Sequence, residues 1–188
     1  MTPHSARSIA CLLTVLLFGA CAPGRDLPPL ADGPAGGYRL GAGDQVRIIT
    51  FGEERLTGEF RVNDSGNIAL PLVGSVRAAG FDSTELETAV AVALKRAGLL
   101  RDPSVAVEVI AYRPVFVLGE VNKPGQYPWQ PGMTVVTAVA VAGGFTYRAV
   151  DDYASVVRTV GGTASEAEAA RQSFIQPGDV VTIFERRF

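Results

Sequence analysis

The sequence has almost none of the side chains that proteins use most often for transition-metal binding and nucleophilic catalysis. Its 188 residues contain one histidine, His4, and two cysteines, Cys11 and Cys21. All three lie at or before residue 21, so residues 22–188 have neither an imidazole nor a thiol. This excludes cysteine–histidine and serine–histidine nucleophile pairs, most zinc sites and disulfides from that part of the chain. We therefore expect a protein that is not an enzyme and that needs no metal or other cofactor.

An excess of positive charge is also missing. There are 17 lysines and arginines against 19 aspartates and glutamates, a net charge of -2, and no basic stripe of the kind that binds nucleic acid. With 47% hydrophobic and 19% charged residues, the composition is that of a folded protein. The length leaves room for one ordinary domain or two small ones.

Long hydrophobic runs are confined to one segment near the N-terminus. Residues 9–18 (IACLLTVLLF) follow Arg7 and are followed by the small residues Gly19 and Ala20. A membrane-spanning helix needs about 20 apolar residues, and this run is about half that length. The pattern therefore predicts a cleavable signal peptide over residues 1–20.

The string LLFGAC resembles a bacterial lipoprotein signal, which would make Cys21 the acylated first residue of the mature chain. Phe18 stands three residues before Cys21, where leucine is usual, so an ordinary secretory cleavage near Ala20 is the alternative. Buried acyl chains hold a protein to a bilayer by about 0.8 kcal/mol per CH₂. By resemblance to enteric lipoproteins, Ala22 after the cysteine favours the outer membrane. We expect an outer-membrane lipid anchor, with the body in the periplasm.

The segment that follows predicts a flexible tether over residues 21–37. It holds four prolines and four glycines and has no apolar period. Such a tether would let a folded body stand away from the membrane surface.

Residues 38–113 predict short strands and one helix. Asp82 or Thr84 can cap a helix over residues 82–98, which carries one apolar stripe and ends at Gly98. Alternating apolar residues predict a strand with one buried face over residues 104–112. Three further strands are expected at residues 45–51, 59–62 and 68–73.

A domain junction is expected at Arg113-Pro114, because the residue before a proline is pushed towards extended geometry. Beyond it, residues 134–142 predict a short buried helix capped by Thr134 and stopped by Gly143. Residues 124–125 predict a turn, residues 164–173 permit a helix without a clear pattern, and strands are expected at residues 115–119, 153–160 and 179–185. The fold class is therefore α+β, with two small domains over residues 38–113 and 114–188.

Two Gly-Asp pairs, Gly43-Asp44 and Gly178-Asp179, each precede a strand rich in β-branched residues. They are consistent either with an internal repeat or with two independent cases of good turn chemistry, and their separation does not establish a repeat.

Several side-chain groups are candidate sites. The acidic pairs Glu53-Glu54 and Asp151-Asp152 could suggest glycoside hydrolysis, but adjacent residues on an extended chain point to opposite sides. Residues 64–67 could suggest a calcium loop, but they offer fewer than the six to eight oxygens that calcium takes. Solvated turns are the expected role of both groups.

Two further groups leave alternatives open. The aromatic residues could stack on sugars or could serve core packing and subunit contact, which is the expected use. The arginines could attract an anionic polymer or could be ordinary exposed strand positions. The aromatic group is Tyr127, Trp129, Phe145, Tyr147 and Tyr153, and the arginines are Arg47, Arg55, Arg61 and Arg77.

Five collinear segments together resemble the polysaccharide export outer-membrane proteins. They are YRLGAGDQVRIITFGE (38–54), DSGNIALPLVGSVRAAG (64–80), LLRDPSVAVEVIAYRPVFVLGEVNKPGQY (99–127), TVVTAVAVAGGFT (134–146) and QPGDVVTIFE near the end. The resemblance implies an export domain followed by a soluble-ligand-binding β-grasp (SLBB) domain.

The resemblance also implies a function and partners. Subunits of such proteins form a homo-oligomeric ring around a channel for capsule or exopolysaccharide, above an inner-membrane polysaccharide co-polymerase that is often linked to a tyrosine autokinase. Longer members continue into an amphipathic pore helix, whereas this sequence stops after a strand, so we expect a short form that relies on a separate channel or on its anchor. A monomeric envelope module that binds a soluble ligand or carbohydrate through its β-grasp domain is the alternative function.

Overall fold

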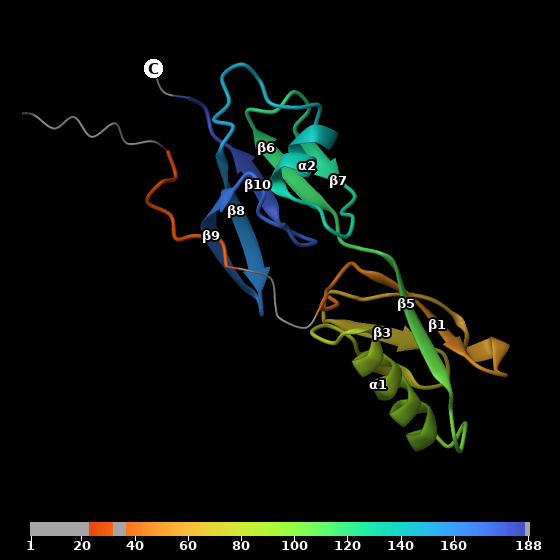
Figure 1. Cartoon of the computed structure of the whole chain (residues 1–188). Helices are drawn as coiled ribbons and strands as arrows, with labels where there is room; N and C mark the ends of the chain where they lie inside the picture. Colours follow the sequence, from red (N-terminus) through yellow and green to blue (C-terminus); the bar gives the residue numbers. More distant parts are fainter. Residues whose placement is uncertain (1–22, 32–36, 187–188) are drawn as a thin grey trace, which may run out of the picture.

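Two hydrophobic cores form in the computed structural model, which describes residues 23–31 and 37–186. Figure 1 shows the two domains end to end, joined by the segment between β5 and β6. The predicted α+β class is confirmed. The predicted signal peptide and Cys21 lie outside the described residues.

The first domain combines a three-stranded antiparallel sheet, a β-hairpin and one long helix, which share a single core. The sheet has the strand order β2-β1-β5, and helix α1 packs against β5 and β4. The elements are β1 (Gln45–Thr50), η1 (Glu54–Leu56), β2 (Gly58–Arg61), β3 (Asn67–Leu70), β4 (Gly74–Arg77), α1 (Ser83–Arg96) and β5 (Val105–Ala111).

Helix α1 confirms the predicted helix and its caps. The Asp82 side chain accepts a hydrogen bond from the Glu85 amide (2.8 Å), and the Glu85 carboxylate accepts one from the Asp82 amide (2.9 Å). This capping box satisfies amide groups that a helix start otherwise leaves unpaired. Leu86, Val90 and Leu94 form the buried stripe.

The predicted single strand over residues 68–73 is wrong, because the chain reverses after Leu70 and forms a hairpin with β4. Pro71 cannot donate a ladder hydrogen bond. Leu72 adopts a left-handed backbone (φ +64°), as does Gly74 (φ +90°), and this brings the next residues back alongside β3.

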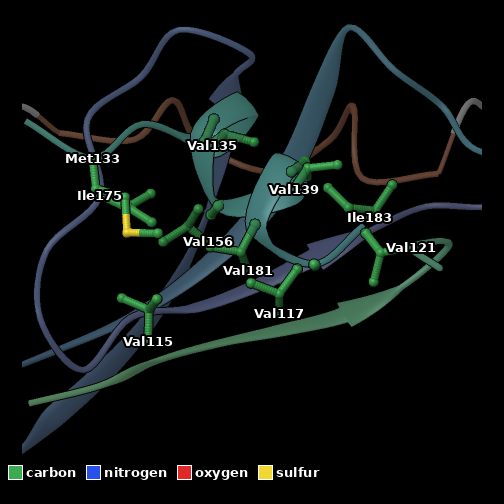
Figure 2. Packing of buried hydrophobic residues seen from close by; sticks show 14 of the residues in the cluster. Val115, Val117, Val121, Met133, Val135, Val139, Val156, Ile175, Val181 and Ile183 are labelled. Atoms are coloured by element: carbon green, nitrogen blue, oxygen red, sulfur yellow. The ribbon is translucent and has the colours of Figure 1, made fainter. Parts of the chain in front are cut away.

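The second domain is a five-stranded mixed sheet with a helix over one face. The strand order is β7-β6-β10-β8-β9, and only the central β6–β10 pair is parallel among the strands described. Figure 2 shows Val135 and Val139 of the helix packed over Val117, Val156 and Val181 of the sheet. The elements are β6 (Val115–Gly119), β7 (Gly125–Tyr127), α2 (Val135–Val141), β8 (Tyr153–Val160), β9 (Thr163–Ala170) and β10 (Val180–Ile183).

Most of the segment over residues 164–173, which the sequence left open, is strand β9. It pairs along its whole length with β8. Ala167 and Ala169 are buried, whereas Glu166 and Glu168 alternate with them. The alanines and glutamates favour a helix, so pairing with β8 overrides their local preference.

The described part of the predicted tether contacts the second domain. Pro29 forms a parallel bridge with Glu168 of β9. The Leu30 amide donates to the Glu168 carbonyl (2.7 Å), and the Glu168 amide donates to the Pro28 carbonyl (2.8 Å). Figure 1 shows this segment, in orange, running beside β8 and β9. We call residues 23–31 the docked segment, because they bind the second domain. The composition alone predicted a flexible tether here.

Helices able to cross a bilayer are not found within residues 23–31 and 37–186.

Candidate functional site

A buried carboxylate, Asp44, connects the start of the first domain to its end. Gly43 has φ +98°, and the turn it permits places Asp44 out of contact with solvent (0% exposed). Its two oxygens accept hydrogen bonds from the amides of Gly41 (2.7 Å) and Arg113 (2.8 Å). The Tyr38 hydroxyl also donates to this carboxylate. Asp44 therefore fixes the position of Arg113, which directly precedes the second domain.

Three aromatic rings pack together across the domain junction. Tyr38 lies edge-on to Tyr112 (centroids 5.0 Å apart) and stacks with Trp129 of the second domain (6.1 Å). Tyr112 and Trp129 are 4.8 Å apart, also edge-on. The Trp129 indole donates to the Ile175 carbonyl (2.8 Å). Because aromatic pairs add about 0.5–1.5 kcal/mol beyond their burial, this cluster resists separation of the domains.

The Tyr38 hydroxyl should make stability sensitive to alkaline pH. Burial, and then the hydrogen bond to Asp44, raise the pKa of Tyr38 above its usual value of about 10. A raised pKa means that the neutral phenol stabilises the fold below about pH 10 and that this contribution is lost as the pH rises further. We expect the free energy of unfolding, measured in urea, to fall more steeply above about pH 10 for the wild type than for Tyr38→Phe. Equal slopes for the two proteins would contradict this.

The second Gly-Asp pair builds the same turn before β10. Gly178 has φ +89°, and Asp179 is 1% exposed. Its carboxylate accepts from the Gln176 amide (2.7 Å), as Asp44 accepts from the amide three residues earlier. Arg158 donates to both carboxylate oxygens (Nε to Oδ1 3.0 Å, Nη2 to Oδ2 2.7 Å). The Arg113 guanidinium likewise lies beside Asp44 (Nε to Oδ1 3.5 Å), so each Gly-Asp pair buries a carboxylate that pairs with an arginine at the start of a strand.

A groove of about 840 Å³ lies where the two domains meet. Four arginines from both domains line it, together with the acidic residues Asp64 and Glu166. Arginines offer several donors to carboxylates and hydroxyls, so this groove is suited to an anionic or hydroxyl-rich ligand. The arginines are Arg39, Arg77, Arg113 and Arg158.

The partners of these arginines differ. Arg39 pairs with Glu85, Arg113 with Asp44 and Arg158 with Asp179. Arg77 donates to the backbone carbonyls of Ala79 (3.1 Å) and Ser65 (3.1 Å), which leaves its positive charge less compensated.

Of the four arginines that the sequence offers as candidates, only Arg77 lines this groove in the described part of the chain. Arg47 pairs with Glu59 (2.9 Å) and Glu108 (3.5 Å) on the outer face of the first sheet. Arg55 and Arg61 are exposed. The structure therefore does not gather the four into one patch.

The aromatic residues are used mainly for packing, as expected. Tyr127, Trp129 and Phe145 pack against the core of the second domain, and Tyr153 is buried. Tyr147 differs, with 88% of its surface exposed.

The acidic candidates do not converge either. Asp151 pairs with Arg186 (3.0 Å) and Asp152 with Arg25 (2.9 Å). Residues 64–67 form a turn in which the Asn67 amide donates to the Asn63 side chain (2.9 Å). Within the described ranges, no group of three or more acidic, histidine or cysteine residues is placed to hold a metal ion.

Two family models match the chain, one over each domain. The family model for polysaccharide biosynthesis/export proteins matches residues 32–110, and that for the SLBB domain matches residues 114–168. The exopolysaccharide production protein ExoF of Rhizobium meliloti is 35% identical over 150 residues, covering 74% of this chain and 35% of ExoF.

Two other relatives carry export or transport in their names. The EPS I polysaccharide export outer membrane protein EpsA of Ralstonia nicotianae is 29% identical over 184 residues, covering 79% of this chain and 48% of EpsA. The polysialic acid transport protein KpsD of Escherichia coli is 29% identical over 109 residues, 57% of this chain and 19% of KpsD. This chain thus spans half or less of the length of these relatives. With its two domains in this order, the chain belongs to the polysaccharide export family, as an export domain followed by an SLBB domain.

Proposed function

We propose that this protein takes part in the export of a capsular polysaccharide or exopolysaccharide through the cell envelope, as a non-catalytic component of an oligomeric ring. The observation that carries the proposal is the consecutive match to an export domain and an SLBB domain, with relatives named for polysaccharide export and production. The junction around Asp44 and Trp129 supports it, because a structural wall needs subunits whose domains keep a fixed relation.

The proposal includes an envelope location. EpsA, the relative with the longest matched region of the three, is named an outer membrane protein. We propose that Cys21 is acylated, that the body lies in the periplasm, and that an inner-membrane co-polymerase with its tyrosine autokinase is the partner across the periplasm. Mass spectrometry of the mature N-terminus tests the acylation directly.

Deletion of the gene is expected to lower surface polysaccharide and to leave polymer trapped in the periplasm. Both pools are measured by fractionation and sugar analysis, and expression of the wild-type gene should restore export. Normal export in the deletion strain would contradict the proposal.

A monomeric module that binds a soluble ligand is the second candidate, favoured by the arginine-lined groove between the domains. The two candidates differ in assembly. Light scattering and negative-stain microscopy should show a closed oligomer for the ring component, whereas a strict monomer at high protein concentration supports the binding module.

A further inference from the structure

Helix α2 carries no charged residue on either of its sides. Its sequence is VVTAVAV, in which only Thr137 is polar. Figure 2 shows that Val135 and Val139 face the sheet, whereas on the outward side Ala140 is exposed and Val141 is 52% exposed. A surface helix normally turns charged and polar groups outward, and a helix that is apolar all round is normally buried all round. The outward side of α2 therefore has the composition of a contact surface.

The opposite side of the second domain has a second apolar surface, on the outer face of the sheet. Phe116 and Leu118 alternate with core residues of β6, so they point away from α2, and they are 39% and 43% exposed. The strand registers place Val180 of β10 beside Phe116, and Val157 of β8 beside Val180. Strands that are apolar on both faces are typical of sheets that are covered on both sides.

The docked segment covers only one end of this outer face. The Arg25 guanidinium lies 3.8 Å from the centre of the Tyr153 ring, and a Cβ at Gly24 would overlap the ring of Phe184. Tyr153 lies on the same face of β8 as Val157, because alternate residues of a strand share a face. The contacts of the docked segment thus bury Tyr153, and they leave the side chains of β6 on this face exposed.

Charged residues of opposite sign border the two surfaces. The helix surface comprises residues 136, 137, 140 and 141, and the sheet surface comprises residues 116, 118, 157 and 180. Beside the helix surface, the Lys123 amide donates to the Ala142 carbonyl (2.8 Å), and the Arg171 carbonyl accepts from the Val136 amide (3.0 Å). Beside the sheet surface, β9 presents the exposed Glu166. None of these three charged side chains takes part in the ion pairs of the described residues.

We propose that the helix surface of one copy of this chain packs against the sheet surface of the next copy; this rests on the oligomer of the proposed function and names the surfaces that hold it together. The two surfaces differ and lie on opposite sides of one domain, so the contact is heterologous and each copy binds two neighbours. Lysine and arginine at the border of one surface then approach glutamate at the border of the other, and such complementary charges fix how two partners align.

A symmetric contact between two sheet surfaces explains these observations less well. It would bring the Glu166 side chains of two copies to the same interface, where like charges repel. It would also leave the apolar helix surface in water. The heterologous contact covers both apolar surfaces, and repeated rotation from copy to copy closes it into a ring.

The contact can be tested by cross-linking between copies, because residues 22–188 contain no cysteine. The full-length protein with Leu118→Cys and Val141→Cys together, purified from membranes in detergent, is treated with a short thiol-specific cross-linker. Each copy is then linked to two neighbours, so we expect a ladder of trimers and larger products on a denaturing gel. Wild-type protein treated in the same way reports any bond formed through Cys21.

The matched control combines Val92→Cys with Val141→Cys. Val92 lies on α1 of the first domain and is 44% exposed, as Leu118 is 43% exposed, so the two thiols are equally accessible. This variant should give several-fold less cross-linked product and no ladder. An equal mixture of the Leu118→Cys and Val141→Cys single variants should give dimers and stop there, because each copy then offers one thiol.

A charge placed in the contact provides a measurement without cross-linking. Leu118→Glu introduces a carboxylate into the sheet surface, and Val92→Glu introduces one at an equally exposed position of the first domain. Both variants should keep the circular dichroism spectrum of the wild type. Light scattering over a range of protein concentrations should show several-fold weaker association for Leu118→Glu and unchanged association for Val92→Glu.

The outcomes distinguish the contact from the function on which it rests. Dimers formed by Leu118→Cys alone, without a ladder from the double variant, would indicate a symmetric contact and overturn the proposal. Oligomeric protein in which the Leu118 and Val92 double variants give equal product would overturn these surfaces and leave the ring standing. Protein that stays monomeric at all concentrations would refute both the contact and the ring, and sugar analysis of the deletion strain would still decide the role in export.

Discussion

Replacing Asp44 by alanine is expected to lower the free energy of unfolding of the first domain by about 3–5 kcal/mol, the usual effect of removing one partner from a buried ion pair. The substitution removes the acceptor of the Gly41 and Arg113 amides, and of the Tyr38 hydroxyl, inside the protein. Each donor left without a partner costs about 1–3 kcal/mol. Urea unfolding followed by circular dichroism measures the change.

A matched control is Glu59→Ala, which removes a carboxylate that pairs with Arg47 at the surface. Exposed pairs contribute about 0–1 kcal/mol, so this variant should be nearly as stable as the wild type. Asp44→Asn keeps one acceptor oxygen and the side-chain volume. Its free energy of unfolding should therefore lie between those of Asp44→Ala and Glu59→Ala. An Asp44→Ala variant no less stable than Glu59→Ala would show that the junction does not depend on the buried carboxylate.

The helices and several strands of this fold could be predicted because their signals are local. Asp82 and Thr134 cap the two helices with groups only three residues away, and both capping boxes are present in the structure. The strand over residues 153–160 coincides with β8. Strand β9 could not be predicted in this way, because its alanines and glutamates favour a helix and only pairing with β8 makes it a strand.

The junction was also beyond prediction, because its partners are distant in sequence. Asp44 and Arg113 are 69 residues apart, and Arg158 and Asp179 are 21 apart. The signal that existed was the repeated Gly-Asp pair, whose chemistry indicated two turns but not which arginine each carboxylate would bind. The docked segment gave a misleading signal: prolines and glycines exclude regular structure, yet they do not exclude pairing with the edge strand of a sheet.

Gly119→Ala is expected to lower the free energy of unfolding of the second domain by about 2–5 kcal/mol. Gly119 has φ +80°, and a left-handed backbone costs a residue with a Cβ about 1–2 kcal/mol. The new methyl group would also overlap the Ile183 carbonyl oxygen in the central parallel pair of the sheet. Relieving such an overlap moves the backbone in a packed core, which typically costs about 1–3 kcal/mol more. Thermal and urea unfolding both report the loss.

Gly132→Ala separates the two contributions within the same domain. Gly132 has φ +81°, but a Cβ there would meet no atom within 4 Å. This variant should therefore lose only the backbone contribution, about 1–2 kcal/mol. Because β10 lies between β6 and β8, an overlap at Gly119 acts on the centre of the sheet, whereas Gly132 lies in a loop. If both variants lost the same stability, the close approach of β6 to Ile183 would contribute nothing, and the requirement for glycine at position 119 would be one of backbone conformation alone.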